Sequence, residues 1–266
     1  MPSFQIKPDE FAQLKQLFAC EDIRILADAR GGNSKVFCVE AEGKKWAVKS
    51  YPPYAPNQRD RLAAECMAYE FLNEHQIQSV PRFKASCLNF RWLIMDWIEG
   101  SIPTHYGHAD IEQAIEFIRQ IGKLNQSAAA KTLPLAAEAC LSLDDLILQV
   151  RKRFDRLRAV AENNSTLEHF LTNRFSPIFD RAQAEAKAAY HQSQMDSSTE
   201  LNEAYRSLIP ADFGFHNSLR DESGRLYFFD FDYFGWDDPV KLLADILWHP
   251  KMALTQDQRQ NQVIKG

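Results

Sequence analysis

The sequence contains no long apolar run and no excess of basic charge. None of its apolar runs reaches the ~18 residues that a membrane-spanning helix needs, and the N-terminus carries neither the basic nor the apolar part of a secretion signal. Its 31 basic residues are fewer than its 36 acidic ones, so no positive field attracts nucleic acid or an anionic membrane. We therefore expect a cytoplasmic protein that acts on a small molecule and binds neither nucleic acid nor membrane.

Paired cysteines are also missing. The five cysteines are scattered without a C-x-x-C pair, which argues against a disulfide framework or a zinc site and favours a reducing compartment. What is present is a chain of 266 residues with 45% hydrophobic content, enough to bury a core in one large domain or two lobes.

Residues 208–239 contain the most informative pattern. Asp212 is followed five residues later by Asn217, and after a turn a hydrophobic strand, Leu226–Phe229, ends at Asp230. In phosphoryl-transfer sites one Asp faces the attacking hydroxyl, while an Asn and a second Asp supply the oxygen atoms that Mg²⁺ prefers. The spacing predicts the metal half of such a site. The alternative is an ordinary polar loop and hairpin, because D-x-x-x-x-N is common by chance.

The N-terminal part is predicted to form a helix over residues 8–20 and three short strands. The strands lie at 23–27, 35–40 and 45–49, with Ala41–Gly43 as a hairpin turn between the last two. Gly31, Gly32 and Ser34 lie between the first two strands and are candidate nucleotide contacts, because a turn with glycine can lay backbone N–H groups over phosphates. The turn lacks the full G-x-G-x-x-G pattern, and a plain hairpin loop is the alternative.

Lys49 ends a strand, Trp46–Lys49, that is similar to the V-A-I-K strand whose lysine reaches the ATP phosphates in kinases. A lysine at a strand end is usually a solvated charge. The apolar spacing of residues 58–73 predicts a helix, and Glu65 borders its buried face. An unpaired carboxylate there would destabilise the folded protein. We expect Glu65 to pair with Lys49 and Glu70 to face solvent.

A further antiparallel pair is predicted at residues 82–88 and 90–98, and Gly100 and Pro103 then mark a boundary. This boundary divides the chain into residues 1–99 and 100–266. An adenine ring could lie against such a hinge, and a sheet strand followed by a linker is the alternative.

The remainder is predicted to be mostly helical, with helices near 109–130, 143–162, 166–191 and 240–250. Ser142 with Asp145, and Ser165 with Glu168, have the spacing of capping boxes. The basic run 151–158 could grip an anionic substrate, and a solvated helix face is the alternative.

Taken in order, these elements make the chain resemble the aminoglycoside phosphotransferase and choline kinase families, which are small-molecule kinases with a protein-kinase-like fold. The resemblance covers roughly residues 25–249. It implies an α+β fold of two lobes: an antiparallel N-terminal sheet with one key helix, which binds the nucleotide, and a mainly helical C-terminal lobe for catalysis and substrate. ATP and Mg²⁺ are the implied cofactors.

The resemblance also implies a role for each matching residue. Lys49 would contact the ATP phosphates and be held by Glu65, Asp212 would be the catalytic Asp, and Asn217 and Asp230 would bind Mg²⁺. Adenine would be held by the hinge, and its candidate contacts are Met95, Asp96 and Ile98.

The chain departs from the family pattern in two places. Pro210 and Ala211 stand where the family usually has His-Gly before the catalytic Asp. The family also has G-D-P followed closely by D-L-A, whereas here Asp245 comes several residues later than that pattern after Asp238-Pro239. A protein kinase is disfavoured, because only seven residues, 231–237, separate Asp230 from Asp238, which leaves no room for a peptide-binding activation loop.

The sequence thus predicts an ATP- and Mg²⁺-dependent kinase that phosphorylates a hydroxyl of a sugar, an aminoglycoside or an amino alcohol. The aromatic and acidic run 232–238 could stack on a sugar or hold a cation, with core packing as the alternative. The rival class is a catalytically inactive nucleotide-binding or interaction protein on the same fold. A metal-dependent phosphohydrolase would leave Lys49 and Glu65 without a role.

Overall fold

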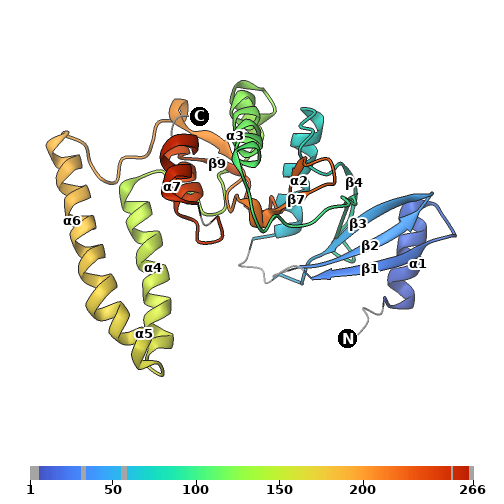
Figure 1. Cartoon of the computed structure of the whole chain (residues 1–266), viewed down its shortest axis with the longest axis horizontal. Helices are drawn as coiled ribbons and strands as arrows, with labels where there is room; N and C mark the ends of the chain where they lie inside the picture. Colours follow the sequence, from blue (N-terminus) through green and yellow to red (C-terminus); the bar gives the residue numbers. More distant parts are fainter. Residues whose placement is uncertain (1–5, 31–33, 55–58, 253, 264–266) are drawn as a thin grey trace.

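The computed structural model describes residues 6–30, 34–54, 59–252 and 254–263 (Figure 1). The fold is mixed α+β, as predicted: an antiparallel sheet near the N-terminus is followed by a mainly helical part. Within the described residues, no helix combines the length and the apolar character needed to cross a membrane.

Five antiparallel strands form the N-terminal sheet in the order β1-β2-β3-β5-β4. Their bounds are Arg24–Arg30 (β1), Lys35–Ala41 (β2), Lys44–Ser50 (β3), Phe83–Cys87 (β4) and Trp92–Asp96 (β5). The predicted hairpin between β2 and β3 is confirmed. Glu42 and Gly43 both have positive φ, 57° and 72°, which is the backbone of a two-residue turn that matches the twist of the strands.

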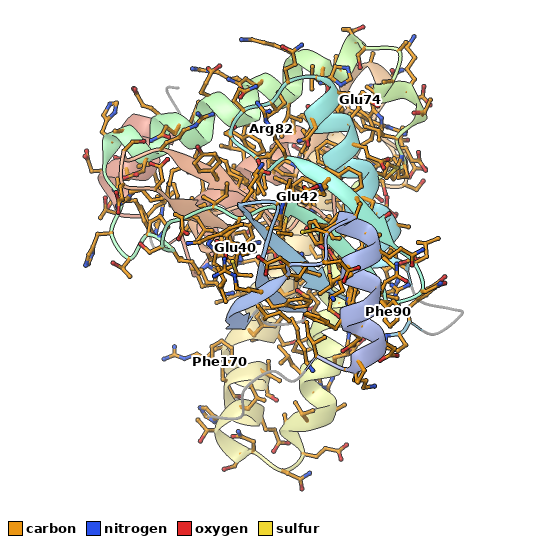
Figure 2. All side chains as sticks on the ribbon, turned by 90° about the vertical axis from the view of Figure 1, so that its right-hand side faces the viewer. Glu40, Glu42, Glu74, Arg82, Phe90 and Phe170 are labelled. Atoms are coloured by element: carbon orange, nitrogen blue, oxygen red, sulfur yellow. The ribbon has the colours of Figure 1, made fainter. Side chains whose placement is uncertain are left out.

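The two faces of the sheet are covered by different helices. Helix α1 (Pro8–Phe18) packs on one face, together with Trp46 and Val48 of β3, and lies on the side of the molecule that faces the viewer in Figure 2. Helix α2 (Arg61–Glu74) shares a core with Ala47, on the other face. Because side chains alternate along a strand, Lys49 lies on the α2 side with Ala47. The strand period therefore aims this lysine at α2.

Helices dominate the rest of the chain. They are α3 (His108–Lys123), α4 (Leu143–Ala161), α5 (Ser165–Phe170), α6 (Ser176–Gln192) and α7 (Pro239–Trp248). Short 3₁₀ turns lie at Leu124–Gln126, Ala130–Thr132, Glu203–Tyr205 and Phe215–Asn217, and π-helical turns at Leu171–Phe175 and Gln258–Val263. Figure 1 shows α4 and α6 as a two-helix arm that extends from the rest of the molecule, with α5 at its tip.

Two small antiparallel strand pairs lie within residues 207–237. Strand β7 (Ser218–Arg220) pairs with β8 (Leu226–Phe228), and β6 (Ser207–Ile209) pairs with β9 (Gly235–Asp237). Gly235 is required for close packing, since a Cβ atom there would lie 2.5 Å from the backbone nitrogen of Ala136.

Several helix bounds differ from the prediction. The helix predicted over 109–130 ends at Lys123 and continues as 3₁₀ turns. The cap predicted at Ser165 is wrong, because Asn164 is the N-cap and its side chain accepts from the N–H of Leu167 at 3.0 Å. The capping box of Ser142 and Asp145 is confirmed.

The basic run on α4 is a solvated helix face, as the alternative interpretation held. Arg153 pairs with Glu138 at 3.0 Å and Arg151 with Asp180 at 3.7 Å, and the four side chains are between 39% and 60% exposed.

One large core joins both parts of the chain. It contains Leu62 and Tyr69 of α2 together with Phe117 of α3 and Phe228 of β8. The division into residues 1–99 and 100–266 remains a prediction.

Candidate functional site

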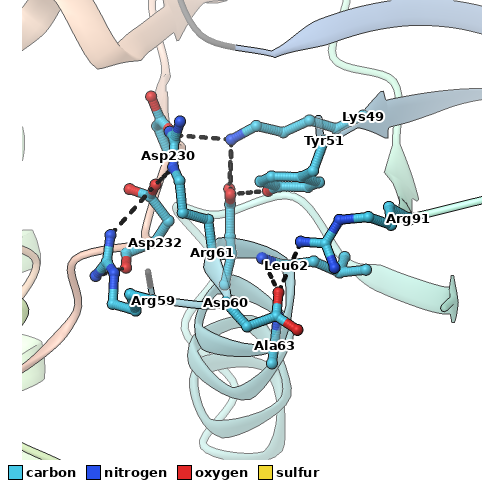
Figure 3. Close-up of polar contacts among 11 residues, drawn as sticks. Lys49, Tyr51, Arg59, Asp60, Arg61, Leu62, Ala63, Arg91, Asp230 and Asp232 are labelled. Carbon is cyan, nitrogen blue, oxygen red and sulfur yellow. Dashed lines mark hydrogen bonds and ion pairs between the residues drawn. The ribbon is translucent and has the colours of Figure 1, made fainter. Parts of the chain in front are cut away.

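Lys49 and Glu65 form a buried ion pair, as predicted. Figure 3 shows the Lys49 ammonium directed at Asp230. The Lys49 Nζ atom donates to both carboxylate oxygens of Glu65, at 2.9 and 2.6 Å, and also to Oδ1 of Asp230 at 2.7 Å. Glu65 is fully buried, and the hydroxyl of Tyr51 donates to it as well. Glu70, on the same helix, is exposed as expected.

The charges at this junction do not cancel. Burial of Lys49 acts to lower its pKa, but the carboxylates of Glu65 and Asp230 outweigh burial and hold the pKa above its ordinary value. Burial raises the pKa of Glu65, and Lys49 opposes that shift. One ammonium faces two carboxylates, and the side chain of Asp230 is 32% exposed. A divalent cation with oxygen ligands therefore suits the open side of Asp230.

Asn217 and Asp230 are brought together by their backbones. The N–H of Phe229 donates to the carbonyl of Asn217 at 3.0 Å, which places Asp230 next to it. The Asn217 amide nitrogen donates to the backbone carbonyl of Asp212 at 2.8 Å, so the amide oxygen points the other way. A carboxylate and an amide oxygen are ligands that Mg²⁺ accepts, and this donor set fits that ion.

Asp212 lies in a loop, and its carboxylate has two histidine side chains beside it. Its side chain is half exposed, and its Oδ1 lies 3.5 Å from Nε2 of His216 and 3.8 Å from Nε2 of His249. The His216 imidazole, assisted by His249, lowers the pKa of Asp212. Ala211, before it, has a φ of 47°, a conformation that costs a non-glycine residue energy. Asp212 is therefore an ionised, accessible carboxylate.

Neither histidine was predicted from the sequence. His216 follows Asp212 by four residues within the same loop, and that proximity was a usable signal. His249 comes from the end of α7 and had no local signal.

Asp212, His216 and His249 present ligand atoms within 4.8 Å of one another. Two imidazoles and one carboxylate would suit a transition metal better than Mg²⁺. The two rings are stacked, however, with centroids 4.6 Å apart and planes inclined by 3°, so their nitrogen lone pairs do not converge on one point. The arrangement places the two imidazoles beside Asp212 at ion-pair distance rather than around a metal ion, and within the described residues neither ring nitrogen of His216 makes a hydrogen bond.

Asp232 is a partner of arginines rather than a ligand site. It is 1% exposed and pairs with Arg61, the first residue of α2, and with Arg59, which precedes the helix (Figure 3). Burial raises the pKa of Asp232, and Arg61 opposes that shift.

The aromatic and acidic run that follows is packed into the core, as the alternative interpretation held. Phe234 is 2% exposed, and Asp237 is fully buried, where it accepts from the N–H of Cys140 at 2.9 Å and pairs with Lys241 at 3.1 Å. Lys241 also reaches Asp245 at 3.4 Å.

The candidate adenine contacts lie where β5 ends. Met95 is buried and opposite Ala47 in the sheet register. The N–H of Asp96 donates to the backbone carbonyl of Arg82 at 2.9 Å, whereas the N–H of Ile98 makes no hydrogen bond within the described part of the chain. Ile98 thus offers a backbone donor at this edge.

Ser34 is half-buried and immediately precedes β2, whose next residues run beside Lys49. The predicted contacts Gly31 and Gly32 lie outside the described residues.

Comparisons with known proteins identify the fold and the family of the chain. Among solved structures, an aminoglycoside phosphotransferase in a ternary complex with streptomycin and ATP is 17% identical and has a TM-score of 0.55, covering 94% of this chain and 80% of that one. A choline kinase from Streptococcus pneumoniae is 12% identical with a TM-score of 0.56, covering 95% and 78%. These likenesses show a protein-kinase-like fold.

An aminoglycoside phosphotransferase from Alicyclobacillus acidocaldarius, 13% identical, has a TM-score of 0.55 and covers 92% of this chain and 71% of that one. No curated protein sequence matches the chain. The model of the phosphotransferase enzyme family matches residues 25–264, nearly the whole length. The chain therefore belongs to the phosphotransferase enzyme family.

Proposed function

We propose that this protein is an ATP- and Mg²⁺-dependent phosphotransferase that acts on a hydroxyl group of a small molecule, such as a sugar, an aminoglycoside or an amino alcohol. The observation that carries the proposal is the contact of Lys49 with both Glu65 and Asp230. A metal-dependent phosphohydrolase has no use for that contact. Solved structures of similar fold bind ATP with streptomycin or are choline kinases, which supports a small hydroxylated acceptor.

In this proposal Lys49 binds the phosphates of ATP, and its pairing with Glu65 fixes the direction of the ammonium group. Adenine would contact the backbone of Asp96 and Ile98 and the side chain of Met95. Gly31, Gly32 and Ser34 would contribute contacts to the phosphates. Residues 1–99 would form the nucleotide-binding lobe and residues 100–266 the catalytic lobe.

Asn217 and Asp230 would hold Mg²⁺, which would neutralise charge on the phosphates. Asp212 orients the acceptor hydroxyl and takes its proton. Its lowered pKa keeps the carboxylate ionised at neutral pH, so it can accept a hydrogen bond from the acceptor. Most of the acceleration comes from positioning and charge, because phosphoryl transfer needs little covalent work from protein groups.

The protein works in the cytoplasm on a freely diffusing acceptor, without nucleic acid or membrane as partner. The acidic balance of the chain supports this assignment.

The test begins with thermal unfolding with and without Mg²⁺-ATP. Binding to the native state at a hundredfold excess over Kd stabilises it by ~2.7 kcal/mol, a rise of several degrees for a chain of this size. A panel of neutral sugars, amino alcohols and aminoglycosides is then assayed for ADP release. Asp230→Ala should abolish turnover, while Glu222→Gln, an exposed carboxylate in the same stretch, should leave it unchanged.

The outcomes separate the candidates. Turnover that survives in Asp230→Ala removes the assignment of that residue. A Mg²⁺-dependent thermal shift without transfer to any acceptor favours the inactive nucleotide-binding protein. Phosphate release that does not depend on an acceptor favours a hydrolase.

A further inference from the structure

One face of α2 makes three contacts with the loop that carries Asp230. Arg61, Glu65 and Tyr69 are spaced by four residues, so they lie above one another on the same side of the helix. All three are directed at residues 230–232: Arg61 at Asp232, Glu65 through Lys49 at Asp230, and Tyr69 at Phe231. We call residues 230–232 the metal loop.

The Arg61 contact is a salt bridge in a nearly closed environment. The Arg61 Nε atom donates to Oδ2 of Asp232, and Asp232 is 1% exposed. Arg59 donates to the backbone carbonyl of Asp232, lies 3.6 Å from its Oδ2 and covers the ring of Tyr233 at 4.3 Å. Two cations and one buried anion thus tie the first turn of α2 to the metal loop.

The Tyr69 contact is apolar. Tyr69 meets the ring of Phe231 edge-on at 5.3 Å, and both side chains are buried. Apolar contact of this kind is not directional enough to set the rotation of a helix. The ion pair at Asp232 is directional, because a guanidinium donates along fixed lines.

Asp232 occupies the place that glycine takes in the D-F-G motif of protein kinases. A glycine has no side chain with which to hold a helix. In protein kinases the position of the helix that carries the pairing glutamate is set by activation-loop phosphorylation. This chain has no room for an activation loop, since seven residues separate Asp230 from Asp238.

We infer that Arg61 and Asp232, assisted by Arg59, are positioning residues that hold α2 so that Glu65 keeps Lys49 aimed at the phosphate site without any activating event. The inference rests on the proposed function for its kinetic consequence, but the placement of Lys49 can be measured without turnover. Because Arg61 is one turn before Glu65, release of the first turn of α2 lets Glu65 withdraw and exposes Lys49.

Two variants break the contact with little change of volume, Arg61→Gln and Asp232→Asn. The matched control is Arg91→Gln, because Arg91 pairs with the N-cap Asp60 of the same helix at 2.8 Å but does not touch the metal loop. The first readout is the rate at which an amine-selective reagent labels Lys49, which is 4% exposed in the intact protein. Loss of a hydrogen bond between charged groups should raise this rate ~10-fold or more, and Arg91→Gln should leave it unchanged.

The second readout is kinetic, measured with any acceptor that the wild type phosphorylates. Both variants should lower kcat by roughly 10²-fold through misplacement of the lysine, with the KM of the acceptor unchanged, since Asp212 is untouched. A purely structural role would lower the urea midpoint and leave the kcat of the folded enzyme intact. The double variant should be no worse than Asp232→Asn alone, because the two side chains act through one contact.

The proposal is wrong if both variants match Arg91→Gln in labelling and in kcat, or if the losses of the two single variants simply add in the double variant. A wild type that phosphorylates no acceptor would remove the proposed function, and the labelling of Lys49 would still decide whether Arg61 and Asp232 hold the helix.

Discussion

Replacing Glu65 by Gln tests the buried junction at the centre of the site. The substitution keeps the volume of the side chain but leaves the Lys49 ammonium, 4% exposed, with Asp230 as its one remaining carboxylate partner. Removal of one partner from a buried ion pair costs about 3–5 kcal/mol. Because Asp230 still accepts from Lys49, we expect the lower end, ~3 kcal/mol.

The matched control is Glu70→Gln, five residues further along the same helix and exposed. Exposed substitutions of this kind stay within about 0.5 kcal/mol. Urea unfolding of both variants measures the difference in free energy. A thermal scan gives the same comparison, with a fall of about 6–12 °C for Glu65→Gln at 2–4 °C per kcal/mol.

The same two variants also test nucleotide binding. If Glu65 aims Lys49 at the phosphates, Glu65→Gln should lose most of the Mg²⁺-ATP-dependent rise in Tm, and Glu70→Gln should keep it. Equal unfolding free energies for the two variants would refute the electrostatic argument. Equal shifts with Mg²⁺-ATP would refute the role of Glu65 in the nucleotide site.

Three further predictions concern the loop, a titrating group and a helix cap. Ala211→Gly should raise the unfolding free energy by up to about 1 kcal/mol, because glycine adopts the positive φ of 47° without strain; a loss in urea unfolding would contradict this. Burial lowers the pKa of His249. The contribution of the neutral imidazole to the free energy of unfolding is therefore complete above the ordinary pKa of 6.5, and it is lost as pH falls from 6.5 through the lowered pKa. Urea midpoints at pH 5.5 and 7.5 should therefore differ less in His249→Asn than in the wild type. Asn164→Ala should lower the free energy of unfolding by ~1 kcal/mol. Ser165→Ala should lower it by less than half of that, because Asn164 is the observed N-cap. A larger loss for Ser165→Ala would support the cap predicted from the sequence.

Local patterns were sufficient for the elements that carry the site. The alternation along β3 and the apolar spacing of α2 placed Lys49 and Glu65 on facing surfaces, and the cost of a buried, unpaired carboxylate then predicted their contact. The same reasoning placed Glu70 in solvent. These predictions succeeded because each depends on the residue's own element and on one rule about buried charge.

Predictions were less reliable where two adjacent residues could both serve as the N-cap of a helix. Asn164 and Ser165 are both good caps, and the glutamate at 168 favoured Ser165 by the capping-box rule. In the structure Ser165 is already helical, and the residue with extended backbone angles is Asn164, with φ of −143° and ψ of 90°. The choice is set by the path of the chain leaving α4, which no local pattern records.

Contacts between distant segments had no signature at all. The pair Arg61 and Asp232 joins residues 171 positions apart, and Asp212 and His249 are 37 positions apart. Either arginine or histidine, seen in the sequence alone, is indistinguishable from a solvated side chain. Their partners become apparent only when α2 and α7 are placed against the loops that follow β6 and β8.

The loop that begins at Pro210 and contains Asp212 shows how contacts between distant segments affect a sequence motif. Where the families that the sequence resembles usually have a histidine, this chain has a buried proline, whose side chain has no hydrogen-bond donor. In the structure the imidazoles next to Asp212 come from His216 and His249, beyond the loop's own start. Gly214 makes this possible, since a Cβ atom there would lie 2.7 Å from Nδ1 of His216. The two imidazoles beside this carboxylate therefore come from later in the chain, and the glycine in the middle of the loop leaves the space that the His216 ring occupies.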